Sequence, residues 1–580
     1  MFGEAFDLLK KNKGLILGFG LFALIYLLPS GTSGNAVVVS DGRGVFVDGD
    51  YAVFENGRVV SMDGVPLVTQ DGKALVVGEI IASREKKVRR NGDEITLHRV
   101  MTENERSVET EDGEEVFVDE DRVITNTWKE VLVKDGRKLT VSEVAVLTKD
   151  AKTIIAITAM AVVFFLTEAI PFPAVAFLIV IGEVIFVGMR PNAVAKSFFS
   201  DSVFFIMGSL MIATAIVKQE LDKRIGLFIL KRTGAKIERV VMGIVATTAI
   251  LAAFIADHTV AAMFLPVGIA LTVKSGDDLK NLGKLMMFAI AYGAAIGGLG
   301  TPSGGARNVI MIEYWRQMYG IDISYGQWML YAFPLVLVMI PITAFILLRI
   351  FKPEVKDLSA AMESIQQEVG EKGRMTQQEW MAAGIFLVTL VMWITVSGQI
   401  GLGIVAIIGA SLYLIFKLVA WDDYNKGVDW GVVLLYAGAI SLGLVMKNTG
   451  AARWLAENFL ALLVPLGANV GIPLVATVSV LVMGVSNTMS NGAAVAVIGP
   501  ITLNMAAISG TSLLMIGFAT AISSAFAYLL VVGTPPNAIV YASGYVRASD
   551  FLKAGGLLAI TSLLVLLVMA MTWWRILGVV

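Results

Sequence analysis

The sequence contains no cysteine and only two histidines, His98 and His258, in 580 residues. Without cysteine the chain forms no disulfide, no metal–thiolate site and no cysteine nucleophile, and two histidines exclude a histidine-rich metal site. Charged residues are also scarce, at 16%, whereas 56% of the residues are hydrophobic. A water-soluble protein of this length would carry more charge, so the composition predicts a polytopic membrane protein.

The few charges are unevenly distributed. Residues 31–150 contain 24 acidic and 16 basic residues, a net charge of −8, whereas the other 460 residues contain 24 acidic and 30 basic residues, a net charge of +6. This asymmetry predicts an acidic, water-soluble insert in a membrane body with basic edges. No nucleotide-binding loop and no pair of catalytic carboxylates stands out. We therefore expect neither an enzyme, nor a cofactor, nor a nucleic-acid partner.

The N-terminus places basic residues before an apolar run. Lys10, Lys11 and Lys13 precede the apolar residues 14–29. A signal peptide has the same order, but no convincing small-residue cleavage site follows. We predict a first transmembrane helix within residues 1–30, and the lysines favour a cytoplasmic N-terminus.

Residues 31–150 have a different pattern. Short runs rich in Val, Phe and Ile alternate with Asn-Gly and Asp-Gly dipeptides, which are typical of β-hairpin turns. We predict a small all-β domain outside the membrane, on the extracytoplasmic side opposite the N-terminus. The dipeptides begin at Asp41, Asp48, Asn56, Asp63, Asp71, Asn91, Asp112 and Asp135.

Apolar segments follow one another closely after residue 151. Each is close to the ~20 residues that a helix needs to cross a bilayer. The charged stretch 352–379 separates a first predicted repeat, 151–351, from a second, 380–580, and neighbouring basic residues favour a cytoplasmic position for this linker. The predicted spans are 152–169, 173–189, 203–221, 282–299, 327–350, 380–397, 401–419, 430–447, 510–532 and 555–576.

Two further apolar segments, 238–273 and 461–508, are interrupted by polar residues. The first contains Asp257 and His258, and the second contains Ser486-Asn487-Thr488. A polar group without a partner costs several kcal/mol in hydrocarbon, so a continuous lipid-facing helix is excluded at both places. We predict two re-entrant hairpins that enter the membrane and return on the same side.

A second kind of break is repeated between the two halves. The pattern G-x-x-x-N-x-I begins at Gly304 and again at Gly533, with an offset of 229 residues. Each copy follows a polar hairpin by about 50 residues. Polar breaks at corresponding positions of two halves indicate a transporter binding site, because broken helices offer N–H groups to anions and free carbonyls to sodium or a proton carrier. The alternative is that the glycines and prolines only aid helix packing.

These motifs resemble the divalent anion:sodium symporter (DASS) family, which includes di- and tricarboxylate and sulfate carriers. The resemblance extends over roughly 151–580 and is most specific in the second half. It implies inverted repeats, a homodimer and an elevator-type movement of the transport part. The residues that carry it are Ser486-Asn487-Thr488, Gly533-Thr534-Pro535-Pro536-Asn537, Leu166 to Pro171, Phe254-Ile255, Ala261 to Met263, Leu265-Pro266 and Ile296 to Gly298.

The resemblance also implies binding residues. Sodium ions are expected as coupling ions and a small anion as the substrate. The resemblance implies Ser486, Asn487, Gly533 and Asn537 as the sodium ligands of the second half, and Asn487 and Thr488 as substrate residues. At the corresponding positions of the first half we predict Asp257, Gly304 and Asn308 as sodium ligands. The further predicted substrate residues are Asp257, His258, Gly305, Arg307 and Pro535.

The first half departs from the family pattern. Ala256-Asp257-His258 stands where the family has Ser-Asn-Thr, and Arg307 stands beside Asn308 in place of proline. Ionisable groups inside a membrane segment indicate function by default. Asp257 would bind sodium or carry a coupling proton. Arg307 would bind an anionic substrate or take the place of the first sodium ion. His258 would donate a hydrogen bond to the substrate or titrate near neutral pH. The alternative is a purely structural Asp257–Arg307 pair.

The predicted fold is therefore an all-α polytopic membrane protein with inverted repeats, two re-entrant hairpins and two broken helices, plus a small all-β soluble domain. The predicted function is secondary active transport of small organic anions, di- or tricarboxylates, across the plasma (inner) membrane with sodium coupling. Proton-coupled or sodium-independent exchange, sulfate transport and a membrane-anchored sensor are the alternatives.

Overall fold

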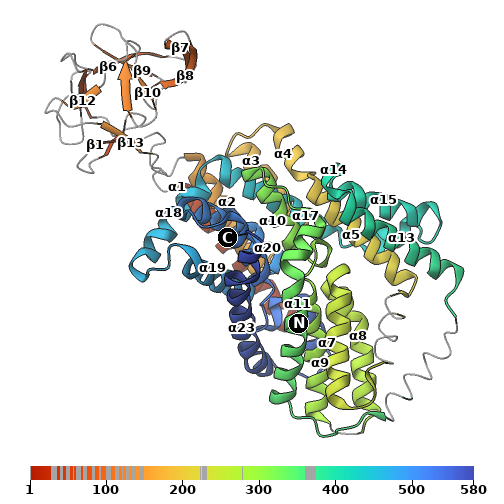
Figure 1. Cartoon of the computed structure of the whole chain (residues 1–580). Helices are drawn as coiled ribbons and strands as arrows, with labels where there is room; N and C mark the ends of the chain where they lie inside the picture. Colours follow the sequence, from red (N-terminus) through yellow and green to blue (C-terminus); the bar gives the residue numbers. More distant parts are fainter. Residues whose placement is uncertain are drawn as a thin grey trace. The chain divides into compact units, whose positions relative to one another are not determined.

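The computed structural model describes residues 2–27, thirteen strands between residues 36 and 142, and residues 149–221, 224, 232–276, 279–359, 363 and 374–579. The chain divides into two compact units (Figure 1). One comprises residues 25–153 with 449–454, and the other comprises residues 1–24, 154–448 and 455–580. Residues 360–362 and 364–373 of the predicted linker 352–379 lie outside the described residues.

The smaller unit contains short antiparallel strands. Strands β3 and β4 flank Asn56-Gly57, and β7 and β8 flank Asn91-Gly92, so both predicted hairpins are confirmed by strand pairing. The sheet orders are β13-β1-β2, β11-β10-β8-β7, β12-β5 and β3-β4-β6-β9. That this region is a soluble, extracytoplasmic domain stays a prediction. The strands are β1 (Ala36–Val39), β2 (Gly44–Phe46), β3 (Val53–Glu55), β4 (Arg58–Val60), β5 (Leu67–Thr69), β6 (Leu75–Ile80), β7 (Glu85–Arg90), β8 (Asp93–Arg99), β9 (Arg106–Thr110), β10 (Val116–Asp119), β11 (Arg122–Thr125), β12 (Val131–Val133) and β13 (Leu139–Ser142).

The larger unit is helical, and each of the ten predicted spans contains a helix. The helices of the first half are α1 (Phe2–Leu27), α2 (Lys149–Thr167), α3 (Phe172–Ile185), α4 (Pro191–Phe198), α5 (Asp201–Lys218), α7 (Ile237–Phe254), α8 (Asp257–Val273), α9 (Lys280–Gly297), η1 (Pro302–Gly304), α10 (Ala306–Tyr319) and α11 (Tyr325–Ile350). Those of the second half are α13 (Gln377–Thr395), α14 (Ser397–Ile400), α15 (Leu402–Ile415), α16 (Trp421–Gly427), α17 (Trp430–Asn448), α18 (Ala451–Leu463), η2 (Val464–Leu466), α19 (Gly471–Ser486), α20 (Asn491–Ser509), α21 (Leu513–Ser524), η3 (Val531–Gly533), α22 (Pro535–Ala542), α23 (Ala548–Met571) and α24 (Trp573–Ile576).

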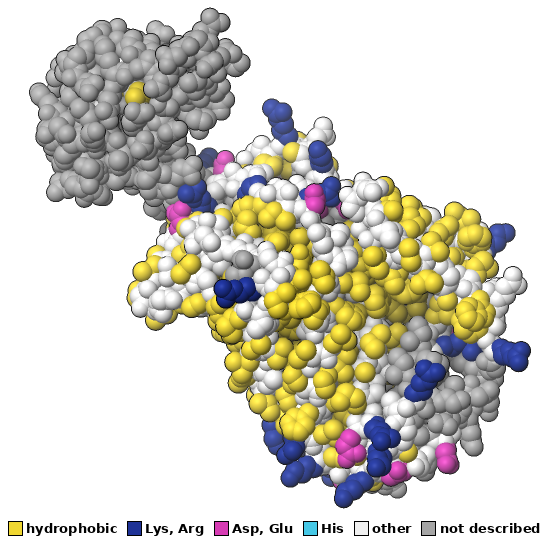
Figure 2. Space-filling view, viewed as in Figure 1, with side chains coloured by type: hydrophobic (Ala, Val, Ile, Leu, Met, Phe, Trp, Pro, Cys, Tyr) yellow, Lys and Arg dark blue, Asp and Glu magenta, His cyan; other side chains and the backbone are white. Residues whose placement is uncertain are grey.

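Eight helical segments among the described residues are long and apolar enough to cross a membrane. Helices α3, α15 and α21 contain only 14, 14 and 12 residues, so these three predicted spans are corrected to shorter apolar helices. The predicted first transmembrane helix is likewise a shorter apolar helix over Lys13–Leu27, and α9, at the predicted span 282–299, is not among the eight. Figure 2 shows hydrophobic side chains over the middle of the visible face of this unit, with Lys and Arg gathered toward its edges. Exposed Leu337, Phe345 and Leu564 belong to the apolar surface. A surface of this kind is suited to lipid, and the chain is a multi-pass membrane protein.

Both predicted polar interruptions form helical hairpins. In the first, α7 ends at Phe254 and α8 begins at Asp257; in the second, α19 ends at Ser486 and α20 begins at Asn491. Helices α8 and α20 each contain a proline nine residues after their first residue, Pro266 and Pro500. This shared position aligns Asp257 with Asn491, and the tip of the second hairpin is longer.

The predicted second break also occurs in both halves. Helix α9 is followed by η1 and α10, and α21 is followed by η3 and α22. The Asn308 side-chain amide donates to the carbonyls of Gly298 (2.9 Å) and Thr301 (2.7 Å), ten and seven residues earlier. The Asn537 amide donates in the same way to Ala527 and Leu530, both at 3.0 Å. These matching bonds confirm the repeat of the G-x-x-x-N pattern.

The helices pack in groups that meet near the broken segments. Helix α5 packs against α15 and α13, and α7 and α8 pack against α9 (Figure 1). Helix α10 contacts α5, α17, α20 and α21. At Gly297 a Cβ atom would overlap the Ala249 carbonyl, so glycine permits the close approach of α9 to α7. This packing leaves a cavity where the hairpin tips and broken helices converge.

Candidate functional site

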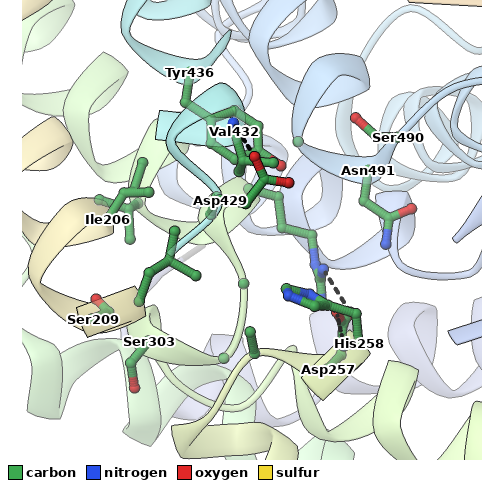
Figure 3. Close-up of a pocket in the computed structure, with 18 of the residues that line it drawn as sticks. Ile206, Ser209, Asp257, His258, Ser303, Asp429, Val432, Tyr436, Ser490 and Asn491 are labelled. Atoms are coloured by element: carbon green, nitrogen blue, oxygen red, sulfur yellow. Dashed lines mark hydrogen bonds and ion pairs between the residues drawn. The ribbon is translucent and has the colours of Figure 1, made fainter. Parts of the chain in front are cut away.

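The cavity has a volume of about 270 Å³ and is lined by residues of both halves. Asp257 and His258 of α8 lie on one side, Ser490 and Asn491 on another, and Asp429 and Tyr436 close a third (Figure 3). Ser209 of α5 and Ser303 of η1 add hydroxyl groups. The lining is thus a mixture of polar tips and apolar helix surface, as in small-molecule sites.

Four helices begin at this cavity. The first residues of α8, α10, α20 and α22, which are Asp257, Ala306, Asn491 and Pro535, all line it. Helix N-termini carry unpaired N–H groups and a partial positive charge. Their convergence therefore favours an anion, independently of any side-chain charge.

Asp257 is positioned by the local structure of the first tip. Ala256 has a non-helical backbone, at φ −52° and ψ 132°, and precedes α8, so Asp257 lies in the first turn of the helix, where the helix dipole stabilises an acidic side chain. Asp257 Oδ1 accepts a 2.8 Å hydrogen bond from the His258 backbone N–H and lies 3.7 Å from His258 Nδ1. Its other oxygen, Oδ2, lies 3.6 Å from Arg307 Nη1.

Arg307 is held inside the protein beside two glycines. Only 3% of the residue is exposed. A Cβ on Gly298 would lie 2.7 Å from Arg307 Nη2, and one on Gly305 would lie 2.7 Å from Nη1. Within the described residues, Arg307 Nε and Nη2 have no hydrogen-bond partner. One side of the guanidinium therefore faces Asp257, while its Nε–Nη2 edge is unpaired.

The second tip is fixed by a network of hydroxyl and amide groups. Ser490 caps α20 by accepting a hydrogen bond from the Ala493 N–H. Ser486 Oγ shares its proton between Ser524 O (2.5 Å) and Asn491 Oδ1 (2.8 Å). Because the oxygen of the Asn491 amide is engaged by Ser486, its Nδ2 group is the one able to donate to a ligand.

The structure brings most of the expected substrate residues together. Asp257, His258, Gly305, Arg307 and Pro535 line the cavity. Asn487 and Thr488, which were also expected to contact the substrate, do not line it. Asn487 instead donates to Met483 O and accepts from the Leu529 N–H, each at 2.8 Å, and the Thr488 hydroxyl donates to Val485 O at 2.7 Å. Both side chains are thus engaged by backbone near the tip.

The expected sodium ligands of the second half lie around one loop. Ser486 bonds to Ser524 O, Asn487 bonds to Leu529 N, and a Cβ on Gly533 would lie 2.9 Å from Ala527 O. The Asn537 amide donates both of its hydrogen bonds to carbonyls of this loop, and its buried Oδ1 has no hydrogen-bond partner among the described residues. An unpaired amide oxygen among backbone carbonyls is the chemistry that a hard cation requires.

The first half repeats this arrangement with a difference. Gly304 lies against the Ala252 and Ala253 carbonyls, and Asn308 Oδ1 is likewise buried without a partner in the described part of the chain. Asp257 and Arg307 lie beside this loop, whereas the second loop has Pro536 at the position of Arg307. The described residues hold no cluster of three or more His, Asp or Glu side chains that could bind a metal.

Sequence reasoning missed Ser490, Asn491 and Gly492, which line the cavity. The signal was present, because Ser-Asn occurs at 486–487 and again at 490–491. The spacing of nine residues from Asp257 to Pro266 recurs only from Asn491 to Pro500, and this spacing identifies the second copy. Asp429 and Tyr436 were also missed, since Asp429 directly precedes α17 and Tyr436 lies within it, and this helix shows no polar break.

The chain is similar to known membrane transporters. The sodium:sulfate symporter transmembrane region matches residues 139–580. The sodium-dependent dicarboxylate transporter SdcS of Staphylococcus aureus strain USA300 is 27% identical over 431 residues, covering 69% of this chain and 82% of SdcS. SdcS of strain NCTC 8325 gives the same identity and coverage.

Among solved structures, Neisseria gonorrhoeae MtrF covers 67% of this chain and 84% of its own at 12% identity and a TM-score of 0.48, a likeness on which no conclusion below depends. The family match, by contrast, extends over far more than half of the sequence and includes both hairpins and both broken helices. The chain therefore belongs to the divalent anion:sodium symporter family of membrane transporters and is not an enzyme.

Proposed function

We propose that this protein is a secondary active transporter that moves small di- or tricarboxylate anions, coupled to sodium, through the cavity at the hairpin tips. The observation that carries the proposal is the convergence of four helix N-termini, from both halves of the repeat, on one polar cavity. Such ends stabilise negative charge without needing a basic side chain. The dicarboxylate assignment is supported by SdcS, which is named as a sodium-dependent dicarboxylate transporter.

The charge of the lining supports sodium coupling. Asp257 and Asp429 outnumber Arg307, so the charged side chains of the cavity carry a net charge of −1. A dicarboxylate would add two negative charges, and the helix ends compensate only part of this charge. Cations bound next to the cavity would supply the remainder. The substrate would then bind well only when sodium is present.

The unpaired amide oxygens mark the proposed ion sites. In the second half we assign Asn537 Oδ1, together with Ser486, Asn487 and Gly533, to one sodium site. In the first half the corresponding set is Asn308, Gly304 and Asp257. The second site is the stronger assignment, because its loop has Pro536 at the position that Arg307 occupies in the first.

The substrate contacts are assigned to the groups that reach the cavity. At the second tip we assign the substrate contacts to Asn491, Ser490 and the N–H of Gly492. The sequence pattern had predicted Asn487 and Thr488 for this role. Asp257 and His258 form the first tip. Asp257 also favours a second candidate, coupling to a proton in place of one sodium, because it is the acidic group of the cavity that sits at a hairpin tip. Sodium-independent exchange and sulfate transport are outcomes that the transport assay distinguishes.

The remaining assignments follow the family resemblance. We propose that the hairpins are re-entrant, that the protein acts as a homodimer, and that the helices bearing the tips move as an elevator against α5, α13 and α15. In the plasma (inner) membrane the N-terminus would be cytoplasmic and residues 31–150 extracytoplasmic, because basic residues collect at the presumed inner ends of the spans.

Uptake into proteoliposomes tests the proposal. The purified protein should accumulate labelled succinate or citrate under an imposed sodium gradient, with sulfate and a proton gradient as comparisons. Asn491→Ala should abolish or strongly weaken uptake. Asn504→Ala is a matched control, because Asn504 lies on the same helix, donates to Pro500 O, and is not among the described residues that line the cavity. No uptake of any of the three anions by the unmodified protein would refute the transport proposal.

A further inference from the structure

We propose that Arg307 binds one carboxylate of the substrate side-on, through its Nε and Nη2 groups, and that Asp257 and Gly305 hold it in position to do so. This inference rests on the proposed transport function and specifies its substrate recognition. A guanidinium presents two parallel N–H groups along this edge, at a spacing that matches the two oxygens of a carboxylate.

The Nε–Nη2 edge of Arg307 needs a hydrogen-bond acceptor that the described residues do not provide. Arg307 lines the cavity and is 3% exposed, and its buried Nε and Nη2 groups have no hydrogen-bond acceptor among the described residues. A buried charged donor without an acceptor is costly, more so than a neutral one. Among the described residues, the anionic neighbour of the guanidinium is Asp257, whose Oδ2 lies 3.6 Å from Nη1. A ligand carboxylate would supply the two missing acceptors.

The structure favours this role over the alternative in which the guanidinium replaces the first sodium. An arginine in the ion position would bond to the oxygen ligand that the ion would use. Asn308 Oδ1 is unpaired, and so are Arg307 Nε and Nη2. The guanidinium therefore leaves the amide oxygen of the first loop free and does not occupy its place.

The structure also explains why the side chain is held in one place. All three nearest atoms to a Cβ built on Gly305 belong to Arg307: Nη1 at 2.7 Å, Cζ at 2.8 Å and Nη2 at 3.2 Å. The backbone of Gly305 is extended, at φ −167° and ψ 136°, which any residue adopts. Gly305→Ala would thus displace the guanidinium without straining the chain. Gly305 and Asp257 are positioning residues for Arg307.

The experiment measures uptake by the full-length protein in proteoliposomes. Arg307→Lys keeps the positive charge and removes the fork, so the KM for succinate should rise by about tenfold to a hundredfold, as expected for loss of a charge-assisted hydrogen-bonded pair. The sodium concentration for half-maximal uptake should stay within about twofold. Gly305→Ala should give the same change in KM, and combining the two substitutions should add little, since both act on one contact.

A second substrate separates carboxylate recognition from a structural effect. Succinamate replaces one carboxylate of succinate with an amide. The unmodified protein should strongly prefer succinate, and Arg307→Gln should reduce this preference by at least tenfold. A structural role would impair both substrates equally and would overturn the inference. So would an unchanged KM in Arg307→Lys and Gly305→Ala, or a shift confined to sodium dependence, which would place the arginine at the ion site.

The two proposals fail in different ways. If the unmodified protein transports none of the tested anions, the transport proposal fails. If it transports succinate but the arginine and glycine variants keep its KM and its preference over succinamate, only the arginine inference fails. If Arg307→Lys does not fold, Gly305→Ala, which alters no charge and no backbone conformation, still gives the deciding measurement.

Discussion

Asn308 and Asn537 offer a matched pair of substitutions that separates the structural from the ion-binding role of the broken loops. Each amide donates two hydrogen bonds to carbonyls ten and seven residues earlier, and each has a buried, unpaired Oδ1. Replacing either with alanine removes the same bonds and the same oxygen. Any difference in sodium response between the two variants is then due to the groups that surround each loop.

The structural cost is set by the carbonyls left without donors. Leaving a buried polar group unpaired costs about 1–3 kcal/mol, so the loss of two such bonds should cost roughly 2–6 kcal/mol in either variant. Both variants should therefore lower the melting temperature of the detergent-solubilised protein by similar amounts when sodium is absent. This shared loss is the internal control for the sodium measurement.

The sodium response should differ between the two. An ion at 100 times its Kd stabilises the folded protein by about 2.7 kcal/mol. Asn537→Ala should lose most of the sodium-induced rise in melting temperature, and its uptake should need at least tenfold more sodium, which corresponds to ~1.4 kcal/mol. Asn308→Ala should change the sodium response less, because the Arg307 guanidinium near Gly298 disfavours a cation at the first loop.

The assays are a thermal-shift titration with sodium, using potassium at equal ionic strength, and succinate uptake at varied sodium concentration. The reasoning is refuted if Asn537→Ala retains a normal sodium response. It is also refuted if the two variants lose that response equally, since the loops would then bind sodium alike despite Arg307.

Two further predictions concern the tip and the helix packing. Ser486→Ala should raise the KM for succinate about three- to tenfold, because Asn491 loses the hydrogen bond that orients its amide, and an unchanged KM would contradict this. A change only in sodium dependence would instead support the predicted role of Ser486 as a sodium ligand. Gly297→Ala should destabilise the folded protein by about 1–3 kcal/mol or more and so lower its melting temperature, because the added methyl group would overlap the α7 backbone. Gly384→Ala is the control, because nothing lies within 4 Å of the added methyl group, and equal melting temperatures would contradict the close approach.

The sequence by itself determined the membrane character and the positions of the breaks. Low charge and long apolar runs require a lipid environment, and polar residues such as Asp257 and Ser486 are too costly for a continuous lipid-facing helix. The G-x-x-x-N repeat likewise predicted two equivalent loops, and the bonds of Asn308 and Asn537 confirm them. These are local properties of composition and spacing, so they can be read without coordinates.

Only the tertiary structure decided which residues of the second hairpin reach the cavity. Ser486-Asn487 and Ser490-Asn491 are four residues apart, about one helical turn, so the same local pattern fits both. Helix α19 continues to Ser486 and α20 begins at Asn491, which turns Asn487 toward backbone and leaves Asn491 at the cavity. The position of that break depends on packing against α21 and α17, which the local sequence does not contain.

The same reason applies to the charged groups of the site. The sequence marked Asp257 and Arg307 as unusual, but they are 50 residues apart and their contact depends on how α8 and α10 begin at one cavity. Asp429, directly before α17, joins them from over a hundred residues further along the chain. The sequence thus determined that this protein lies in a membrane and breaks its helices in pairs. The tertiary structure decided which polar groups meet, because contacts between distant segments are set by helix packing rather than by local pattern.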